Sequence, residues 1–355
     1  MASSHHPSRR QFAVIGAGIA GLACARTLLN AGHGVQVFEA APEPGGRLAT
    51  QDSPFGGFDT GAQYFTVRDP RFSTALQTTA PDVVRPWSVN AVRVLDERGR
   101  VVEAASPPRE AHWLAVPAMR QLPQRWAEPL RDSGALHLDT RVARIARDTL
   151  TPERWQLHVQ DGEGKHPVHA GFDAVVLALP SHDARLLLLA SEQLAHLAEP
   201  LSAVEMAPCW ALMVAFPNAV QPGLQTLGPQ WNAARSTHHR AAWLARESSK
   251  PGRTQVERWV VHASRAWSSE HAHDDPARVT GKLLKAFAEI TGIRATPALA
   301  QAVLWHQSQT LKPLGQHYLW HDTLGIGLCG DWCIGQRVED AFVSGLELAL
   351  RIVEP

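Results

Sequence analysis

The residues best placed for chemistry near the start of the chain are three glycines and an acid. Gly16, Gly18 and Gly21 form a G-x-G-x-x-G pattern, and Glu39 follows one helix and one strand later. In such a pattern the first glycine allows a tight turn, the second lets a pyrophosphate approach the backbone, and the third lets helix and strand pack closely. A carboxylate at the position of Glu39 can accept hydrogen bonds from ribose hydroxyls. The spacing predicts a dinucleotide site, with FAD or NAD favoured over NADP.

The elements around this pattern are the ones that would position it. An apolar run over residues 12–15 is typical of a buried parallel strand, apolar residues between 22 and 29 recur at helical spacing, and 35–38 form a second strand. The N-terminus of the helix would present N–H groups and the positive end of its dipole to phosphate. A glycine-rich turn without a ligand would leave Glu39 unexplained.

Two further stretches in the first quarter of the chain could contact the same ligand. The sequence GGR at 45–47 combines exposed backbone N–H groups with a guanidinium suited to phosphate. The sequence GAQY at 61–64 supplies small residues, against which a flat ring can lie, beside an aromatic one. A surface turn and a buried loop are the alternatives, and both stay open at this point.

The C-terminal region carries the second strong pattern. A strand over 325–329 ends in Gly330-Asp331, and a helix is expected from Arg337 to Ile352. Asp331 could accept hydrogen bonds from the hydroxyls of a ribityl chain. The N–H groups near Val338 could face a pyrimidine carbonyl and stabilise negative charge there.

Composition excludes several classes of function. The chain has 355 residues, which favours two domains or one large composite, and its formal net charge is zero with 18 histidines held neutral. No electrostatic argument therefore favours nucleic acid or an anionic membrane as a partner. No apolar run is long enough to span a bilayer, and the polar N-terminus lacks a secretory signal. Four cysteines suggest neither a disulfide framework nor a zinc site, so we expect a cytoplasmic, reduced protein without metal.

Taken together, these motifs resemble the flavin-containing amine oxidoreductase superfamily. The matching segments are GAGIAGL with Glu39, GGRL at 45–48, TRVARI at 140–145, AVVLALP at 174–180, and GDWC and VEDAFVSG within 330–345. Within that group the chain is most similar to the bacterial renalases, over nearly its whole length. The closer motifs are FDTGAQYFTVRDPRF at 58–72, WLARESSKP at 243–251 and CGDWCIGQRVEDAFVSG at 329–345.

The resemblance implies an α/β fold with an interrupted Rossmann-like FAD-binding domain of the glutathione-reductase/p-hydroxybenzoate-hydroxylase type. A mixed α+β substrate domain is spliced into it. We expect the FAD-binding domain at 10–78, 136–190 and 305–355, and the substrate domain at 79–135 and 191–304. The implied contacts to non-covalently bound FAD, with Val142 reaching adenine through its backbone, are Gly16, Gly18, Ala20, Gly21, Glu39, Gly46, Arg47, Gly61, Ala62, Gln63, Val142, Gly330, Asp331 and Val338.

Renalases oxidise 2- or 6-dihydro isomers of NAD(P)H to NAD(P)+ and pass the electrons to O2, which gives H2O2. The partners implied are a small dihydronicotinamide and O2. Hydride transfer from a dihydropyridine to flavin N5 needs no side-chain base, so no catalytic acid or base is assigned. The side chains that could line such a site are Tyr64, Trp305, Lys312 and Arg337, with His306 and Tyr318 as further possibilities.

Two other functions remain open at this point. One is an amine oxidase or dehydrogenase, and the other is a flavin-binding module without turnover. Amine oxidases usually place an aromatic residue where this chain has Arg337, whose charge would repel an ammonium and could attract phosphates. Alternatively, Arg337 pairs with Glu339, Asp340 or Asp331 and is structural. Asp340 stands where relatives often have glycine, and Cys329 and Cys333 lie close enough to the motif to leave covalent flavin attachment open.

Overall fold

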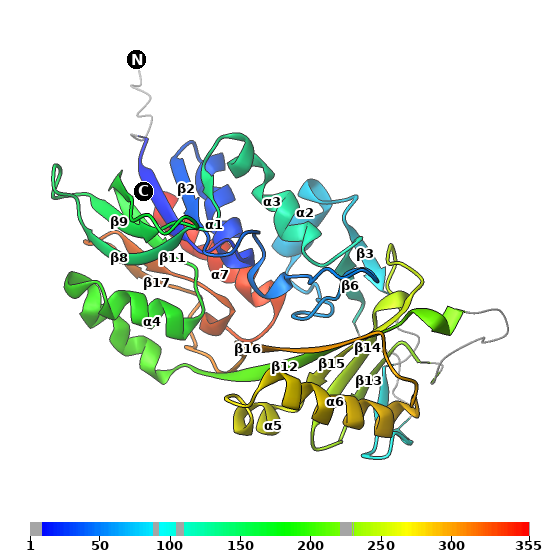
Figure 1. The fold of residues 1–355 in the computed structure, drawn as a ribbon. Coiled ribbons are helices and arrows are strands. Elements are labelled where there is room, and N and C mark those ends of the chain that lie inside the picture. The colour runs from blue at the N-terminus through cyan, green and yellow to red at the C-terminus, as the bar shows by residue number, and fades with distance from the viewer. Residues whose placement is uncertain (1–8, 88–91, 104–109, 221–228, 230, 355) are drawn as a thin grey trace. The chain divides into compact units, whose positions relative to one another are not determined.

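The computed structural model describes residues 9–87, 92–103, 110–220, 229 and 231–354. The chain forms two compact units, each assembled from separate segments (Figure 1). Unit 1 comprises Met1–Gly46, Pro123–Glu205 and Thr310–Pro355, and unit 2 comprises Arg47–Leu122 and Met206–Gln309.

Unit 1 is built on a six-stranded sheet in the order β17-β18-β11-β1-β2-β7. The strands are β1 (Gln11–Ile15), β2 (Gly34–Phe38), β7 (Leu136–His137), β11 (Ala174–Leu177), β17 (Leu319–His321) and β18 (Ile326–Leu328). All pair in parallel except β17, which runs antiparallel to β18. Every residue of β11, at the centre of this sheet, is buried, as expected for a strand covered on both faces.

Helices and a small second sheet complete unit 1. The helices are α1 (Ile19–Asn30), α3 (Gln121–Asp132), α4 (Ser181–Leu189), the 3₁₀ helices η2 (Glu192–Ala203) and η5 (Asp331–Cys333), and α7 (Val338–Val353). Helices α1 and α7 lie side by side (Figure 1). A Cβ at Gly345 would come within 2.0 Å of the Ala20 carbonyl oxygen, so glycine permits this close crossing. Strands β8 (Arg141–Arg147), β9 (Trp155–Gln160) and β10 (Val168–Phe172) form an antiparallel meander before β11.

Unit 2 contains a seven-stranded sheet in the order β16-β12-β15-β14-β13-β4-β5. The strands are β4 (Arg93–Leu95), β5 (Val101–Glu103), β12 (Glu205–Phe216), β13 (Ala233–Ser236), β14 (Ala241–Arg246), β15 (Glu257–Ala263) and β16 (Leu299–Lys312). Helices α5 (Arg265–Glu270) and α6 (Pro276–Thr291) cover one face (Figure 1). The remaining elements are 3₁₀ helices η1 (Gly46–Leu48), η3 (Pro217–Val220) and η4 (Glu247–Ser249), helix α2 (Pro70–Thr79) and the paired strands β3 (Val84–Trp87) and β6 (His112–Ala115).

The two faces of the unit 2 sheet carry different residues because side chains alternate along each strand. Leu212 and Val261 join the main core together with Leu283 and other residues of α6. Met213 and Val260 point to the other face and pack with Phe58. We call this second face the loop-side face, because the loop that contains Phe58 lies on it.

The compact units differ from the predicted domain boundaries in three main places. Residues 47–78 belong to unit 2, and residues 123–135 and 191–205 belong to unit 1. The contacts explain these differences. Ser191 Oγ accepts a hydrogen bond from Ile145 N of β8 at 2.9 Å. Asp59 is bound to Lys250 and Arg253 of the second half of the chain, whereas Trp126 packs on Phe342 with ring centroids 5.7 Å apart. The assignment of an FAD-binding and a substrate-binding role to parts of the chain stays a prediction.

Candidate active site

The first glycine turn of unit 1 has an open side at its centre. Gly16 has φ of +101°, a value that favours glycine, and a Cβ at Gly21 would lie 2.0 Å from the Gly16 oxygen. A Cβ at Gly18, by contrast, would meet nothing within 4 Å. The first and third glycines are therefore required by packing, and the second leaves space for a ligand.

Helix α1 starts at this open side. Gly18 is its N-cap residue, and no side chain caps the helix there. The N–H groups of the first turn, which includes Ala20, and the positive end of the helix dipole therefore remain for an anion. This is the arrangement in which helix N-termini bind phosphate.

Glu39, at the end of β2, holds the glycine turn in place. Its Oε2 accepts a hydrogen bond from Ala17 N at 2.7 Å, and its Oε1 accepts one from Ala41 N at 2.9 Å. Each carboxylate oxygen has a second lone pair, so the predicted ribose contact can be added to these bonds. Thr140 N donates to the Glu39 carbonyl at 2.8 Å, which brings the start of β8, and with it Val142, beside this acid.

The second glycine turn lies against the first, as their predicted common ligand requires. Gly45 N donates to the Ala17 carbonyl at 3.0 Å. Gly46 has φ of +52°, and a Cβ there would lie 3.5 Å from the Cα of Gly18. The structure thus brings Gly46 to the open side of the first turn. These features fit FAD: an uncapped helix start, two adjacent glycine turns and an acid.

Close packing also explains the glycine of the C-terminal Gly330-Asp331 segment. A Cβ at Gly330 would come within 2.4 Å of Trp332 Nε1, and Gly330 N donates to Ser344 Oγ at 3.0 Å. Asp331 is buried, and Thr310 Oγ1 donates to its Oδ2 at 3.4 Å. Val338 opens α7 directly after this segment.

Arg337 forms ion pairs with its helical neighbours. Its Nη2 lies 3.3 Å from Asp340 Oδ1, and its Nη1 lies 3.9 Å from Glu339 Oε2. The Asp340 carboxylate also accepts a hydrogen bond from Arg337 N at 2.9 Å, which explains an acid where relatives often have glycine. Of the two interpretations of Arg337, the structure shows the ion pair, and its charge is already balanced.

In unit 2, close backbone packing explains the small residues at 61 and 62. A Cβ at Gly61 would come within 2.1 Å of the Arg47 carbonyl oxygen, and Ala62 N donates to that oxygen at 2.9 Å. Arg47 Nη1 donates to Ser308 O at 3.2 Å. Contact between these residues and a flavin ring remains a prediction.

Gln63 belongs to a buried group of charges that the sequence did not reveal. Its Nε2 donates to the Asp59 carbonyl, and its Oε1 accepts from Lys250 Nζ at 3.1 Å. Lys250 Nζ also lies 2.9 Å from Asp59 Oδ2 and 2.6 Å from Glu247 Oε1, and the side chains of all three charged residues are 0% exposed. With Arg253, whose Nη2 lies 2.6 Å from Asp59 Oδ2, these residues form what we call the Lys250 cluster.

The pKa values of the two carboxyl groups of the Lys250 cluster are shifted in opposite directions. Burial raises the pKa of Glu247, and the charge of Lys250 only partly offsets it. For Asp59 burial acts in the same direction, but Lys250, Arg253 and the Thr50 hydroxyl outweigh it and hold its pKa well below the usual range. The sequence signal was WLARESSKP, which contains Glu247 and Lys250, but nothing in it points to Asp59.

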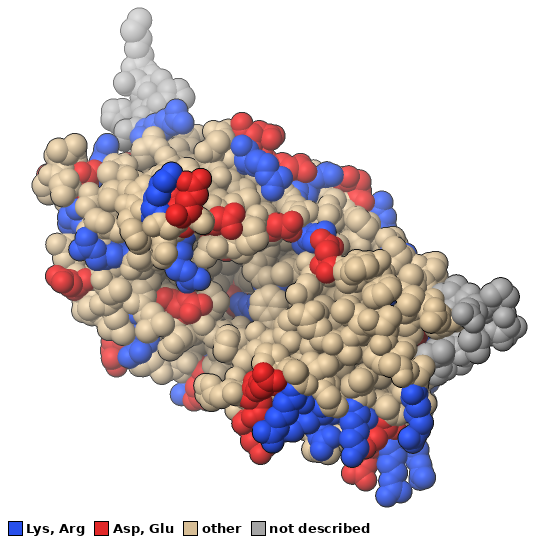
Figure 2. Space-filling view, viewed as in Figure 1, with Lys and Arg blue, Asp and Glu red and all other residues tan. Residues whose placement is uncertain are grey.

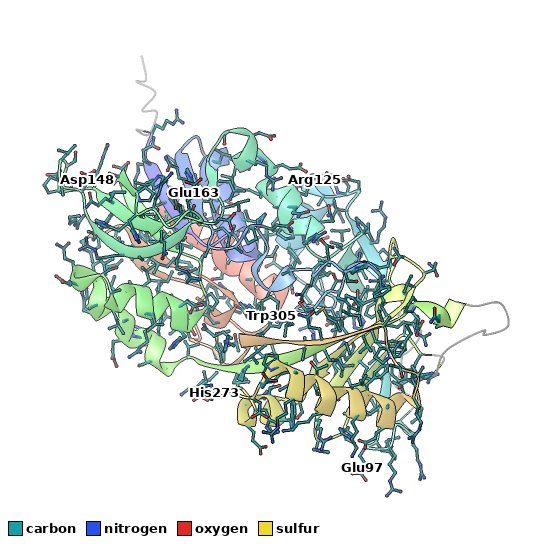
Figure 3. All side chains as sticks on the ribbon, viewed as in Figure 1. Glu97, Arg125, Asp148, Glu163, His273 and Trp305 are labelled. Atoms are coloured by element: carbon teal, nitrogen blue, oxygen red, sulfur yellow. The ribbon has the colours of Figure 1, made fainter. Side chains whose placement is uncertain are left out.

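The loop-side face carries the aromatic residues of the candidate site. The Thr60 carbonyl accepts from Trp305 Nε1 at 3.1 Å and forms a 3.0 Å hydrogen bond with His262 Nε2 (Figure 3, in which Trp305 is labelled on β16). Burial lowers the pKa of His262 to about 4, so its ring is neutral at pH 7. Tyr64 stacks on His112 with ring centroids 3.9 Å apart and lies 5.7 Å from Trp243.

The remaining predicted lining residues are divided between the units. Tyr64 and Trp305 belong to unit 2, and Lys312 and Arg337 belong to unit 1. Lys312 and His306 are exposed, and Tyr318 is half-buried. The four cysteines are all free and buried, and burial raises the pKa of Cys333 to about 12 and that of Cys329 well above its usual value. Neither thiol is therefore activated as a nucleophile toward flavin.

The described residues show neither a metal-binding cluster nor a membrane-spanning helix. Within the described ranges, no group of three or more His, Cys, Asp or Glu side chains could hold a metal ion. In the same part of the chain, no helix is both long and apolar enough to cross a bilayer. Figure 2 shows basic and acidic side chains interspersed over the face in view.

Two protein-family models match the chain. The model of an NAD(P)-binding Rossmann-like domain matches residues 14–78, and that of the flavin containing amine oxidoreductases matches residues 109–353, more than half of the chain. The chain belongs to the flavin containing amine oxidoreductase family. It is thus an FAD-dependent oxidoreductase, in agreement with the glycine turns and uncapped helix start of unit 1.

Related structures share the fold of this family member. A putative protoporphyrinogen oxidase from Exiguobacterium sp. 255-15 has a TM-score of 0.73 at 14% identity and covers 97% of this chain and 99% of its own. A triple mutant of putrescine oxidase has a TM-score of 0.71 at 12% identity with the same coverage. The α/β fold with a Rossmann-like domain is therefore confirmed.

One curated relative is similar over a short segment. The putative L-amino-acid oxidase YobN of Bacillus subtilis (strain 168) is 47% identical over 55 residues, which are 16% of this chain and 11% of that protein. The match thus spans about a tenth of the relative's length and does not carry over its activity.

Proposed function

We propose that this FAD-dependent oxidoreductase oxidises 2- or 6-dihydro isomers of NAD(P)H to NAD(P)+, with O2 as electron acceptor and H2O2 as the second product. Three long motifs similar to those of the bacterial renalases support the proposal, and they come from both units: 58–72, 243–251 and 329–345. Residues of separate motifs also meet in the folded chain, which a chance match in sequence would not explain. Asp59 and Lys250, from two different motifs, are in direct contact.

The observation that carries the proposal is the charge balance of unit 2. Asp59 and Glu247 are fully buried and form ion pairs with Lys250 and Arg253, so each carboxylate already has a cation beside it, although Glu247 Oε2 has no hydrogen-bond partner among the described residues. His262 is neutral and bonded to the Thr60 carbonyl. These groups do not offer a cationic amine a partner, and they do not hinder a neutral dihydropyridine ring.

The proposed reaction requires no side-chain acid or base for the hydride transfer. When bound, FAD would supply a two-electron acceptor for the hydride, and O2 would take up that hydride together with one proton from solvent to give H2O2. The substrate ring becomes aromatic as it loses the hydride, so no side chain has to remove a proton. The work left to the residues is to hold the ring in position and to keep water away.

An oxidase of amines or amino acids is the second candidate function. Proteins named as such enzymes are similar to this chain, the putrescine oxidase in its fold and the putative L-amino-acid oxidase over a short segment. From the sequence, the charge of Arg337 is expected to repel an ammonium substrate. Because Arg337 is paired with Asp340, its charge is balanced and is no longer an argument against an amine substrate.

Anaerobic rapid mixing separates the two functions. The holoprotein is mixed with borohydride-made isomers of NADH and NADPH, and in parallel with primary amines, polyamines and L-amino acids, while flavin absorbance is followed. We expect the isomers alone to bleach the flavin, and NAD(P)+ and H2O2 to appear in equal amounts once O2 is admitted. Bleaching by amines or amino acids and never by the isomers would show that the second candidate is the right one.

A further inference from the structure

A row of three side chains crosses the loop-side face of the unit 2 sheet. Arg235 on β13 is directly opposite Trp243 on β14, and Trp243 is opposite His262 on β15. Directly opposed residues of antiparallel strands point to the same side of a sheet. Their strand neighbours Ala234, Leu244 and Val261 all belong to the core on the other face. The row therefore lies on the face that also carries Thr60.

Arg235 is the charged residue of this row. Its side chain is exposed, and among the described residues its guanidinium has no ion-pair or hydrogen-bond partner. By contrast, Arg253 and Lys250 of the same unit form buried ion pairs with carboxylates. Arg235 also lies near His112, whose pKa is lowered by burial and further by the charge of Arg235. An unpaired guanidinium beside a neutral imidazole attracts an anion.

Aromatic rings with unused donors stand next to Arg235. Tyr64 stacks on the His112 ring with centroids 3.9 Å apart, and its ring lies tilted at 44° to that of Trp243, 5.7 Å away. Trp87 Nε1, Trp243 Nε1 and His112 Nδ1 are buried without a hydrogen-bond partner in the described part of the chain. Buried polar atoms are rarely left unpaired in native proteins, so this cluster lacks an acceptor. The oxygens of a planar, anionic ligand would supply it.

We propose that Arg235, Trp243 and Tyr64 form a subsite for the nicotinamide mononucleotide half of the substrate. The nicotinamide ring packs against Tyr64 and Trp243, and the phosphate binds Arg235. Offset stacking of a flat ring on aromatic side chains is favourable, and guanidinium binds phosphate through two parallel hydrogen bonds. Arg235 and Trp243 are cross-strand neighbours, so the ribose can bridge the two contacts. This subsite rests on the proposed function, whose substrate it specifies.

Calorimetric titration of the oxidised holoprotein tests the subsite without turnover. The two ligands are nicotinamide mononucleotide and nicotinamide riboside, which differ by the phosphate. We expect Arg235→Gln to weaken binding of the mononucleotide about tenfold, as for the loss of one charged contact, and to leave binding of the riboside unchanged. Arg93→Gln is the matched control, because Arg93 pairs with Ala234 and so faces the opposite side of the same sheet.

Several results would overturn the subsite. They are equal binding of the two ligands by wild type, no binding of either, or an Arg235→Gln variant that loses both ligands equally or keeps both. Trp243→Ala provides the second readout and should weaken both ligands, because it removes the ring contact that they share.

The test also separates this inference from the proposed function. If Arg235→Gln selectively loses the mononucleotide while wild type fails to oxidise any dihydro isomer, the subsite stands and the function is wrong. If wild type oxidises the isomers and Arg235→Gln keeps the wild-type KM for them, the function stands and the subsite is wrong.

Discussion

The two units build their candidate sites from different materials. In unit 1 the site consists of backbone: two glycine turns, an uncapped helix start and one acid that fixes the loop. In unit 2 it consists of side chains, with a buried charge cluster under Gln63 and an aromatic row beside Arg235. A backbone site requires glycines at fixed spacing, whereas a side-chain site can draw its residues from anywhere in the chain.

This difference also changes what each site costs to maintain. Gly21 and Gly345 allow close backbone contacts that leave no space for a methyl group, so unit 1 requires residues without a side chain at these positions. The Lys250 cluster buries two positive and two negative groups, and each charge is tolerable only while its partners remain. Substitutions in the two units should therefore fail in different ways.

The largest effect is expected in the Lys250 cluster. Lys250→Met leaves Asp59 and Glu247 with Arg253 as their sole cation in the cluster, and loss of one partner from a buried ion pair costs about 3–5 kcal/mol of unfolding free energy. Adding Glu247→Gln restores the charge balance, so the double variant should be more stable than Lys250→Met alone. Urea unfolding of the holoprotein measures both.

Lys285→Met is the matched control for this prediction. Lys285 lies on α6 of the same unit with its side chain 69% exposed, and its loss should change stability by less than about 0.5 kcal/mol. A Lys250→Met variant as stable as this control would show that the cluster does not support unit 2.

A smaller effect concerns acid stability and His262. The pKa of His262 falls from 6.5 to about 4 on folding because the ring is buried. Between these values the unfolded chain binds a proton that the folded chain does not, so stability is full above pH 6.5 and decreases as the pH falls. Relative to neutral pH, the loss from this group at pH 5 amounts to about 2 kcal/mol.

His262→Gln isolates this contribution, because the glutamine Nε2 amide can donate to the Thr60 carbonyl that His262 Nε2 contacts but does not titrate. Urea unfolding at pH 7, 6 and 5 should show a smaller acid loss for the variant than for wild type. Parallel losses in the two proteins would mean that His262 is protonated in the folded state or is not buried.

The sequence predicted the backbone site well and the side-chain site poorly. The geometry of a strand, a tight turn and a helix fixes the spacing of Gly16, Gly18, Gly21 and Glu39. The structure brings these residues together with Gly46. Membership of the family, the α/β fold and FAD could be inferred from them and from the C-terminal motif.

The contacts of the side-chain site could not be inferred, because they join distant segments. Asp59 and Lys250 are far apart in sequence, and no motif with a fixed spacing links the two positions. Arg235 becomes conspicuous only when the sheet register places it beside Trp243. For Arg337 the sequence offered two interpretations, and only the geometry of Asp340 distinguishes them. Gly61 could be read as a surface for a flat ring, but its close approach to Arg47 explains it without one.

The most direct test of a backbone-built FAD site is the pair Gly18→Ala and Gly345→Ala. A Cβ at Gly18 meets no protein atom within 4 Å, whereas one at Gly345 lies 2.0 Å from the Ala20 oxygen. FAD affinity of the reconstituted apoprotein is measured beside its unfolding free energy. We predict that Gly18→Ala keeps or slightly raises stability but binds FAD at least about tenfold more weakly, and that Gly345→Ala is destabilised. A Gly18→Ala protein that binds FAD as tightly as wild type would contradict the account.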